Sequence, residues 1–399
     1  MSGRDYQIGL ADMQPYLGFW GQLKKPFFVL APMANVTDAP FRRIIAKHGR
    51  PDVTWTEFVS ADGLCHPKGR EALLRDLWYT EGERPIVTQL FTAHPEKMFE
   101  AAKFVAGLGF DGIDINMGCP DKNVMKQGAG ATLMKDPKLA QAIIRAAQEG
   151  AREGMKNRTP QSRRRDSSPW KGEQEKLFSL TTSPFQGEGR EGFGEIPISV
   201  KTRLGYNEDN LEEWLPALLE TKPAVITVHA RTKKEMSKVP ARWERVKRAV
   251  EIARGSGTLI IGNGDVKDLA DAEAKVRETG CDGVMLGRAV FGNPWLFADV
   301  ARARHGSDGN EAGWTQVTVR ERLEAAVEHT KLFEEVWGDT KSFELMKKHY
   351  QAYVNHFLLA KELRIELMDC HAAREVDQVI EKFLAEHGDI AALPVMIHD

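Results

Sequence analysis

The sequence is poor in cysteine and has no long apolar run. Four cysteines occur among 399 residues, and no two of them form a close CxxC pair. Because zinc ribbons, iron–sulfur clusters and disulfide frameworks need closely spaced thiols, we expect no structural metal and no disulfide scaffold. Sparse, scattered thiols suit the reducing cytosol, so we expect a cytoplasmic protein. No segment reaches the roughly eighteen consecutive apolar residues of a membrane span, so we expect no membrane partner.

Charge of one sign is not in excess either. The formal net charge is -2, with 55 Lys and Arg against 57 Asp and Glu. This balance excludes a broadly basic nucleic-acid coat, although a local basic patch is compatible with it. Hydrophobic residues make up 42% of the chain and charged residues 28%, a mix that can bury a sizeable core.

Eight short runs rich in apolar and β-branched residues alternate with segments of helical periodicity. Near-continuous apolar strands separated by amphipathic helices indicate a parallel sheet covered by helices. Eight such units within 27–305 predict an α/β fold, a (β/α)8 TIM barrel. An open doubly wound sheet is the alternative, but no GxGxxG follows the first predicted strand. The predicted strands lie in 27–33, 52–58, 85–91, 111–118, 196–203, 224–231, 258–265 and 282–288.

Three segments lie outside this alternation. Residues 1–26 form an N-terminal extension before the first strand. Residues at about 155–195 are rich in Ser, Pro, Gly, Arg and Glu, which predicts a disordered insertion before the fifth strand. After a linker, residues 313–399 hold no clear strand but several amphipathic helical stretches, so we expect an all-α helical bundle after the barrel. Within this tail, the run KKHY (347–350) is either an RNA-binding patch or a solvated helix face.

One cysteine stands at a predicted strand end. The fourth strand ends in NMGCP, which places Cys119 in a turn between Gly118 and Pro120. A free Cys is most often a small buried hydrophobe. However, the carboxyl ends of the strands build the active site of such barrels, so this position favours a functional role. The other three cysteines lack this setting, and we expect them to pack in the core.

Cationic side chains gather at the next two strand ends. Lys201 and Arg203 close the fifth strand, and His229 and Arg231 close the sixth. Because side chains alternate along a strand, each pair projects from one side of its strand. The four groups then converge on one mouth of the barrel, and such a cluster needs an anionic occupant.

The last two strands end in glycine-containing loops. They are GNGD (262–265) and LGR (286–288), in the positions where barrels often bind phosphate. Glycine lets backbone N–H groups approach an anion, and Arg288 would add a charge-assisted contact. A phosphate together with a lysine at the fifth strand indicates a phosphorylated planar cofactor, of which FMN fits best. Around its ring we expect Lys201 at the pyrimidine edge, Gln89 at the amide edge and Pro32-Met33 as an apolar wall.

Several of these motifs together resemble the tRNA-dihydrouridine synthase family. They are APMANVTDAPFR (31–42), DINMGCPDKNVMKQGAGATLM (114–134), VKTR, VHART, GNGD and LGRAVFGNPWLF (286–297), and they span about 27–300 in order. The resemblance implies an FMN-bound barrel that reduces a specific uridine in tRNA to 5,6-dihydrouridine with NADPH as the electron donor. It also implies that the helical tail at 313–399 binds tRNA. We expect the protein to be a monomer.

The resemblance assigns roles to individual residues. Cys119 matches the catalytic cysteine of the family. The positions that match its flavin-binding residues are Pro32, Met33, Ala34, Gln89, Lys201, His229, Asn263, Gly264, Asp265, Gly287 and Arg288. Two features depart from the family pattern. The insertion at about 155–195 is foreign to it, and the loop TKKEMSKVPARWE (232–244) lacks the Tyr and Gly expected there.

The chemistry of uracil is consistent with these roles. Its carbon 5–carbon 6 double bond is conjugated to a carbonyl, so hydride adds at carbon 6 and a proton must reach carbon 5. A thiol with a pKa of about 8.5 is mostly protonated at neutral pH, so Cys119 can donate that proton, although nearby cations would lower its pKa. A stacked uridine must be splayed out of the RNA to reach a barrel mouth. Asn116 and Arg203 are candidates for base contacts and Arg231 for a base or phosphate contact, with support of the flavin or the fold an equal alternative.

Two other functions remain open. A flavin barrel acting on a free pyrimidine, of the dihydroorotate or dihydropyrimidine dehydrogenase type, also places a cysteine near a flavin. The helical tail and the lack of iron–sulfur cysteines argue against it. A non-catalytic RNA-binding barrel is the other alternative, and the presence of both Cys119 and Lys201 argues against that.

Overall fold

The computed structural model describes residues 14–156, 195–298, 317–391 and 393. Nearly all of the predicted insertion at 155–195 lies outside the described residues, and so does the predicted linker before the helical tail. The boundaries predicted for these two segments therefore stay predictions.

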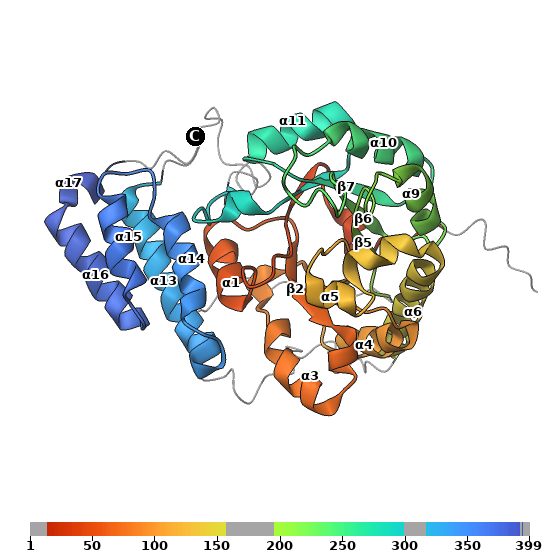
Figure 1. The fold of residues 1–399 in the computed structure, drawn as a ribbon, viewed down its shortest axis with the longest axis horizontal. Helices are drawn as coiled ribbons and strands as arrows, with labels where there is room; N and C mark the ends of the chain where they lie inside the picture. Colours follow the sequence, from red (N-terminus) through yellow and green to blue (C-terminus); the bar gives the residue numbers. More distant parts are fainter. Residues whose placement is uncertain (1–13, 157–194, 299–316, 392, 394–399) are drawn as a thin grey trace, which may run out of the picture.

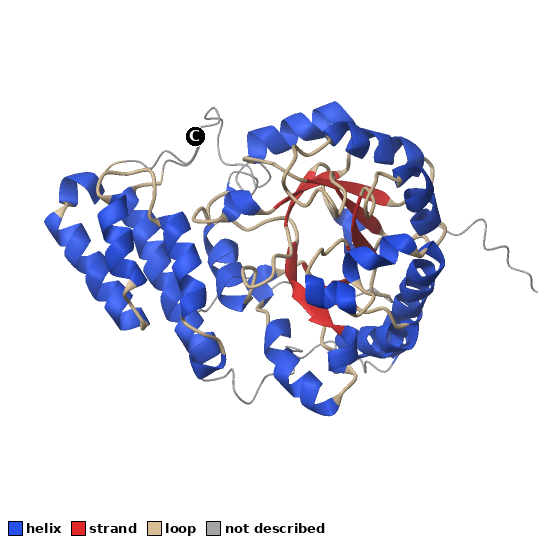
Figure 2. Cartoon of the chain, viewed as in Figure 1, coloured by secondary structure: helices blue, strands red, loops and turns tan. Residues whose placement is uncertain are grey.

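Eight parallel strands form the centre of the larger domain, with helices around them (Figure 2). In the sheet they follow the order β1-β8-β7-β6-β5-β4-β3-β2, and a parallel bridge between Val29 and Val53 connects the two ends. The predicted (β/α)8 barrel is confirmed: seven predicted strand segments each contain one strand, and β2 begins within 52–58 but extends two residues beyond it. The strands are β1 Phe27–Leu30, β2 Thr54–Ser60, β3 Ile86–Phe91, β4 Gly112–Met117, β5 Ile198–Arg203, β6 Val225–His229, β7 Leu259–Asn263 and β8 Gly283–Leu286.

The helices of the barrel begin and end at common capping residues. The Asp38 carboxylate accepts the N–H of Phe41 at 3.2 Å and so caps the first turn of α1, which has Pro40 near its start. Gly280 ends α11 in the left-handed conformation that glycine adopts most readily. The barrel helices are α1 Ala39–His48, α2 Ala61–Leu64, α3 Pro67–Leu73, α4 Pro95–Gly107, α5 Lys122–Lys126, α6 Pro137–Lys156, α9 Leu211–Leu219, α10 Trp243–Ala253 and α11 Leu269–Thr279.

The interior of the barrel is apolar near the amino ends of the strands. Phe27, Val87 and Ile261 belong to one buried cluster with Trp55. Trp20 joins this cluster from the short helix η1 (Gly18–Gln22), with its ring centroid 5.6 Å from that of Trp55. Part of the predicted N-terminal extension therefore packs against the barrel core. The polar residues lie toward the carboxyl ends of the strands, where the barrel opens to a candidate site.

The chain after the barrel is all helical, as predicted. Its helices are α13 Val319–Trp337, α14 Glu344–Tyr353, α15 Ala360–Met368, α16 Ala373–Glu386 and α17 Gly388–Ala391. They form a bundle beside α1 (Figure 1), and Lys47 of α1 forms a 2.6 Å ion pair with Glu328 of α13. The bundle core also includes Ala39 and Trp78 of the barrel, so the two domains share apolar contacts.

The run 347–350 is not one continuous surface. Tyr350 is fully buried and its hydroxyl lies 3.1 Å from the Thr330 hydroxyl. His349 is also buried, and its ring stacks on Phe291 with centroids 5.9 Å apart. Neither a solvated face nor an RNA-binding patch fits these two residues, because both pack at or near the domain interface.

No helix among the described residues combines the length and apolar character needed to cross a membrane. Within the same ranges, no group of three or more His, Cys, Asp and Glu side chains is arranged to hold a metal ion.

Candidate active site

The turn after β4 holds Cys119 through the side chain of Asn116. The Asn116 carbonyl oxygen accepts the N–H of Gly118 at 3.1 Å and that of Cys119 at 2.9 Å. The Cys119 carbonyl in turn accepts the N–H of Ala131 at 3.0 Å. The sequence left a base contact and structural support as equal alternatives for Asn116, and the described contacts give it a role in shaping this turn, while a base contact stays a prediction. The turn leaves the Cys119 side chain half-buried.

The thiol lies in a mixed environment. Burial raises the pKa of Cys119 above its ordinary value, although the positive charges of Lys201 and Arg203 lower it. The sequence left open which effect is larger, and in the structure burial outweighs the cations. Cys119 therefore keeps its proton at neutral pH.

A buried carboxylate links this turn to the neighbouring strands. Asp114 accepts hydrogen bonds from the Gln89 amide and the Ser199 hydroxyl, both at 2.6 Å, and Gln89 accepts one from Asn116 at 2.9 Å. Burial raises the pKa of Asp114 to about 6, against the lowering effect of these hydrogen bonds. Gln89, a predicted flavin contact, is fully buried and braces both β4 side chains. Sequence reasoning missed Asp114 and Ser199, although their positions two residues before Asn116 and Lys201 place them on the same side of their strands.

Lys201 occupies the centre of the polar end of the barrel. Its ammonium donates to the Asn263 side-chain oxygen across the barrel at 3.3 Å, and the Asn263 amide donates to the Met285 carbonyl at 2.8 Å. Burial, followed by the charge of Arg203, lowers the pKa of Lys201 to about 8. The structure thus brings Lys201 and Asn263 together, as their predicted shared role requires.

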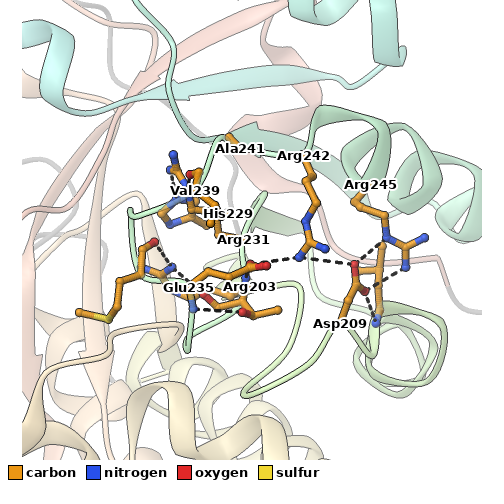
Figure 3. A network of polar contacts seen from close by, with 12 residues as sticks. Arg203, Asp209, His229, Arg231, Glu235, Val239, Ala241, Arg242 and Arg245 are labelled. Carbon is orange, nitrogen blue, oxygen red and sulfur yellow. Dashed lines mark hydrogen bonds and ion pairs between the residues drawn. The ribbon is translucent and has the colours of Figure 1, made fainter.

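Arg203 joins the Cys119 turn to the loop after β6, and Figure 3 shows Arg203 beside Glu235 of that loop. Its Nε donates to the Gly118 carbonyl at 2.8 Å, and its Nη1 donates to the carbonyls of Thr232 and Met236 at 3.2 and 3.0 Å. Burial lowers the pKa of Arg203 to about 10. Of the two roles that the sequence left open for Arg203, these contacts favour structural support, and a base contact stays a prediction.

Arg231 and Arg288 share one carboxylate. Arg231 is buried, donates to the Val239 carbonyl at 2.6 Å and pairs with Asp265. Arg288 is exposed and donates to the other oxygen of Asp265 at 2.6 Å. Burial raises the pKa of Asp265, but hydrogen bonds from Arg231 and the Ala241 N–H outweigh it and hold the pKa below its ordinary value. Sequence reasoning assigned Asp265 to the cofactor and missed that it neutralises part of the cation cluster.

His229 and the glycine loops complete the mouth. His229 Nε2 lies 3.3 Å from Arg231 Nη1, and burial together with the surrounding cations keeps the pKa of His229 well below its ordinary value. Gly264 has φ +127°, and a Cβ there would lie 2.9 Å from the Ala241 Cβ and 3.2 Å from the His229 ring. Because Gly264 has no side chain, its backbone is open to a ligand above this loop. At Gly287, a Cβ would come within 3.4 Å of the Met33 sulfur.

The loop between β1 and α1 forms the opposite side of the mouth. Pro32 and Met33 are half-buried there and Ala34 is exposed. The Met33 N–H donates to the Thr37 hydroxyl at 2.9 Å, which closes the loop on itself. The backbone N–H of Asn35, in the middle of the loop, donates to the Glu57 carboxylate of β2. Glu57 is a contact that the sequence did not predict, since nothing in the local pattern links positions 22 residues apart.

The residues at this mouth fit a planar ligand that carries a phosphate. The four cations Lys201, Arg203, Arg231 and Arg288 face the carboxylates of Asp114, Glu235 and Asp265. Glu235 also pairs with Arg242, so the mouth has excess positive charge. The hydroxyl of Thr227, the register partner of Lys201 on β6, is buried and has no hydrogen-bond partner among the described residues. An anion at the glycine loops and a polar ring beside Lys201 would satisfy groups that the protein leaves unsatisfied.

Comparison with known proteins identifies the family. The sequence profile described as Dihydrouridine synthase (Dus) matches residues 29–156 and 191–387. The chain belongs to the dihydrouridine synthase family. One relative is a probable tRNA-dihydrouridine synthase of Staphylococcus aureus (strain MRSA252), which is 33% identical over 92% of this chain and 96% of its own. Another is a probable tRNA-dihydrouridine synthase 2 of Bacillus subtilis (strain 168), which is 33% identical over 93% of this chain and 98% of its own.

Membership of the dihydrouridine synthase family makes the chain an enzyme of the oxidoreductase class. The non-catalytic barrel is therefore set aside. The family match omits 157–190, a stretch that falls inside the predicted insertion. Among solved structures, histamine dehydrogenase from Rhizobium sp. 4-9 aligns with a TM-score of 0.47 and 13% identity over 76% of this chain and 48% of its own, a likeness too low to indicate shared chemistry.

Proposed function

We propose that this dihydrouridine synthase reduces a specific uridine in tRNA to 5,6-dihydrouridine, with FMN at the barrel mouth and NADPH as the electron donor. The observation that carries the proposal is the turn at Cys119, which holds the thiol beside a cation cluster at the carboxyl ends of the strands, where burial raises its pKa. The tRNA substrate is supported by the names of the relatives.

Cys119 is the proposed proton donor. Reduction of uracil needs a hydride at carbon 6 and a proton at carbon 5, and FMN, when bound, would supply the hydride. The raised pKa of Cys119 keeps its proton available, and the two hydrogen bonds from the turn to Asn116 fix where the thiol lies. As the proton moves to carbon 5, the neighbouring charges of Lys201 and Arg203 stabilise the thiolate that Cys119 becomes.

The strand ends supply the residues that would hold FMN. Lys201 would bring its charge to the pyrimidine edge of the ring, and Gln89 would offer its remaining amide N–H. The loop residues Pro32, Met33 and Ala34 would form the apolar wall. For the phosphate we propose the backbone N–H groups of the two glycine loops with the cations around them; these residues are His229, Asn263, Gly264, Asp265, Gly287 and Arg288.

The substrate uridine must leave its stack to reach this mouth, so we propose that it is extruded from the tRNA. Asn116, Arg203 and Arg231 stay candidates for contacts with the base or its phosphate. The helical domain, 313–399, is proposed to bind the rest of the tRNA. We propose that the protein acts on this substrate in the cytoplasm, and as a monomer.

The test is a comparison of substrates with the purified protein. Bound flavin is first read from the absorbance spectrum. NADPH consumption is then measured with tRNA and with free uracil or orotate, and dihydrouridine is mapped in the tRNA product. We expect a yellow protein that turns over only with tRNA. Turnover of the free pyrimidines without tRNA would replace the proposal by the dehydrogenase alternative, and a protein that binds no FMN would overturn the flavin assignment.

A further inference from the structure

A lysine of the helical domain reaches into the barrel domain. Lys341 follows the short helix η7 (Gly338–Thr340), in the connection between α13 and α14. Its ammonium lies 3.4 Å from a carboxylate oxygen of Glu57 and 3.0 Å from one of Asp76, both on the barrel. The same ammonium lies 3.6 Å from the ring centroid of Trp337. Its side chain is 21% exposed, so this cation is largely removed from water.

Glu57 connects Lys341 to the β1–α1 loop. One oxygen of its buried carboxylate faces Lys341, and the other accepts the backbone N–H of Asn35. Asn35 has φ +56°, a left-handed conformation that asparagine tolerates better than most residues and that surrounding contacts can stabilise further. The Glu57 carboxylate is such a contact, and it acts at the middle of the loop.

The helical domain holds the end of the same loop as well. The Trp337 indole N–H donates to one oxygen of Asp38 at 2.8 Å, while the other oxygen caps α1 through the N–H of Phe41. Met33 and Ala34, which are proposed to form the flavin wall, directly precede the attachment at Asn35, and the Met33 N–H donates to the hydroxyl of Thr37, which lies between the two attachments. The conformation of that wall therefore depends on contacts supplied by α13 and the connection after it.

The charge of Glu57 depends on its cation. Burial raises the pKa of Glu57, and the charges of Asp38 and Asp76 raise it further, whereas Lys341 lowers it most. Lys348 of α14 also acts electrostatically on Asp38 and Glu57. Without Lys341, Glu57 would take up a proton or turn toward water, and the charge-assisted hydrogen bond to the loop would weaken.

We propose that Lys341 is a positioning residue for the cofactor: through Glu57 it holds the β1–α1 loop in the conformation that receives the flavin ring. This inference rests on the proposed function, because it takes the flavin to lie against that loop. It makes the helical domain part of the flavin site as well as a domain for binding tRNA.

The experiment measures FMN affinity of apo-protein by flavin fluorescence quenching, together with the visible absorbance of the bound flavin. Lys341→Met should raise the FMN dissociation constant about tenfold, the loss expected when one charge-assisted hydrogen bond is weakened. Lys341→Arg should restore most of the affinity. Glu57→Gln should weaken FMN binding, and the double variant should bind no more weakly than the weaker single variant, because the two residues act in one chain of contacts.

Lys47→Met is the matched control, since it also removes an ion pair between the domains, the 2.6 Å contact with Glu328, but it does not touch the loop. A merely structural role predicts that Lys341→Met and Lys47→Met behave alike, and equal FMN affinity in wild type and Lys341→Met would overturn the inference. Should Lys341→Met fail to fold, unchanged FMN affinity in Glu57→Gln would overturn it equally. Failure of the wild type itself to bind FMN would instead contradict the proposed function.

Discussion

Replacing Asn116 by alanine tests how the Cys119 turn is held. The change removes the acceptor of two backbone hydrogen bonds, at 3.1 and 2.9 Å, and the donor of a third to Gln89 at 2.9 Å. Asn116 is nearly fully buried, so water cannot readily replace the lost partners. With about 0.5–1.5 kcal/mol for each net hydrogen bond, we expect a loss of roughly 2–4 kcal/mol in the free energy of unfolding. At about 2–3 °C for each kcal/mol, the melting temperature should fall by roughly 5–10 °C.

The two half-reactions should respond differently. Flavin reduction by NADPH does not need the turn, so its rate should change little in Asn116→Ala. Flavin reoxidation by tRNA needs a correctly placed thiol, and a misplacement of about 1 Å can cost on the order of 100-fold. Rapid mixing separates the two rates, and calorimetry gives the melting temperature.

Asn116→Ser is the graded control, because a serine hydroxyl can accept one of the two N–H groups of the turn. We expect it to recover part of both the melting temperature and the reoxidation rate. The reasoning is refuted if Asn116→Ala keeps the wild-type melting temperature while its affinity for tRNA falls. That result would show that Asn116 contacts the base and contributes little to the turn.

Three further predictions follow from the same contacts. Lys201→Met and Arg288→Ala should each weaken FMN retention, measured by titrating apo-protein, and full retention in both would exclude these strand ends as the flavin site. Burial raises the pKa of Asp114 from 3.8 to about 6, so the free energy of unfolding should fall as the pH rises from about 4 through 6 and Asp114 ionises. Asp114→Asn should remove this part of the pH dependence, measured by denaturant unfolding. Trp337→Phe should lower the free energy of unfolding by about 1–3 kcal/mol, measured in the same way, because it leaves the Asp38 carboxylate without its 2.8 Å donor.

The barrel could be predicted from the sequence because its signals are local. Each strand is a short apolar run followed by a helical pattern, and eight repeats leave few other arrangements. The position of Cys119 could be predicted for the same reason, since Gly118 and Pro120 mark a turn within three residues. The convergence of the cations Lys201, Arg203, His229 and Arg231 could be predicted because they close two consecutive strands.

The pairing of charges could not be predicted, because it depends on loops that meet only in space. Asp265 neutralises Arg231 from 34 residues away, and Glu57 meets Lys341 from 284 residues away. Arg203 illustrates the same limit. Its cationic type suggested an anionic or base partner, whereas the described contacts of its guanidinium are backbone carbonyls that only the folded loops bring to it.

The measurement that most directly tests the proposed chemistry is the rate at which tRNA reoxidises the reduced flavin in Cys119→Ala. The variant should bind FMN and accept electrons from NADPH like the wild type, and its reoxidation by tRNA should slow by about 100- to 10,000-fold through loss of the general acid. Cys65→Ala is the matched control, since Cys65 is also a half-buried free thiol but follows α2, with its sulfur 3.6 Å from the Lys97 carbonyl oxygen. It should reoxidise at the wild-type rate. A wild-type reoxidation rate in Cys119→Ala would contradict the account, because Cys119 would then be a packing residue in its turn.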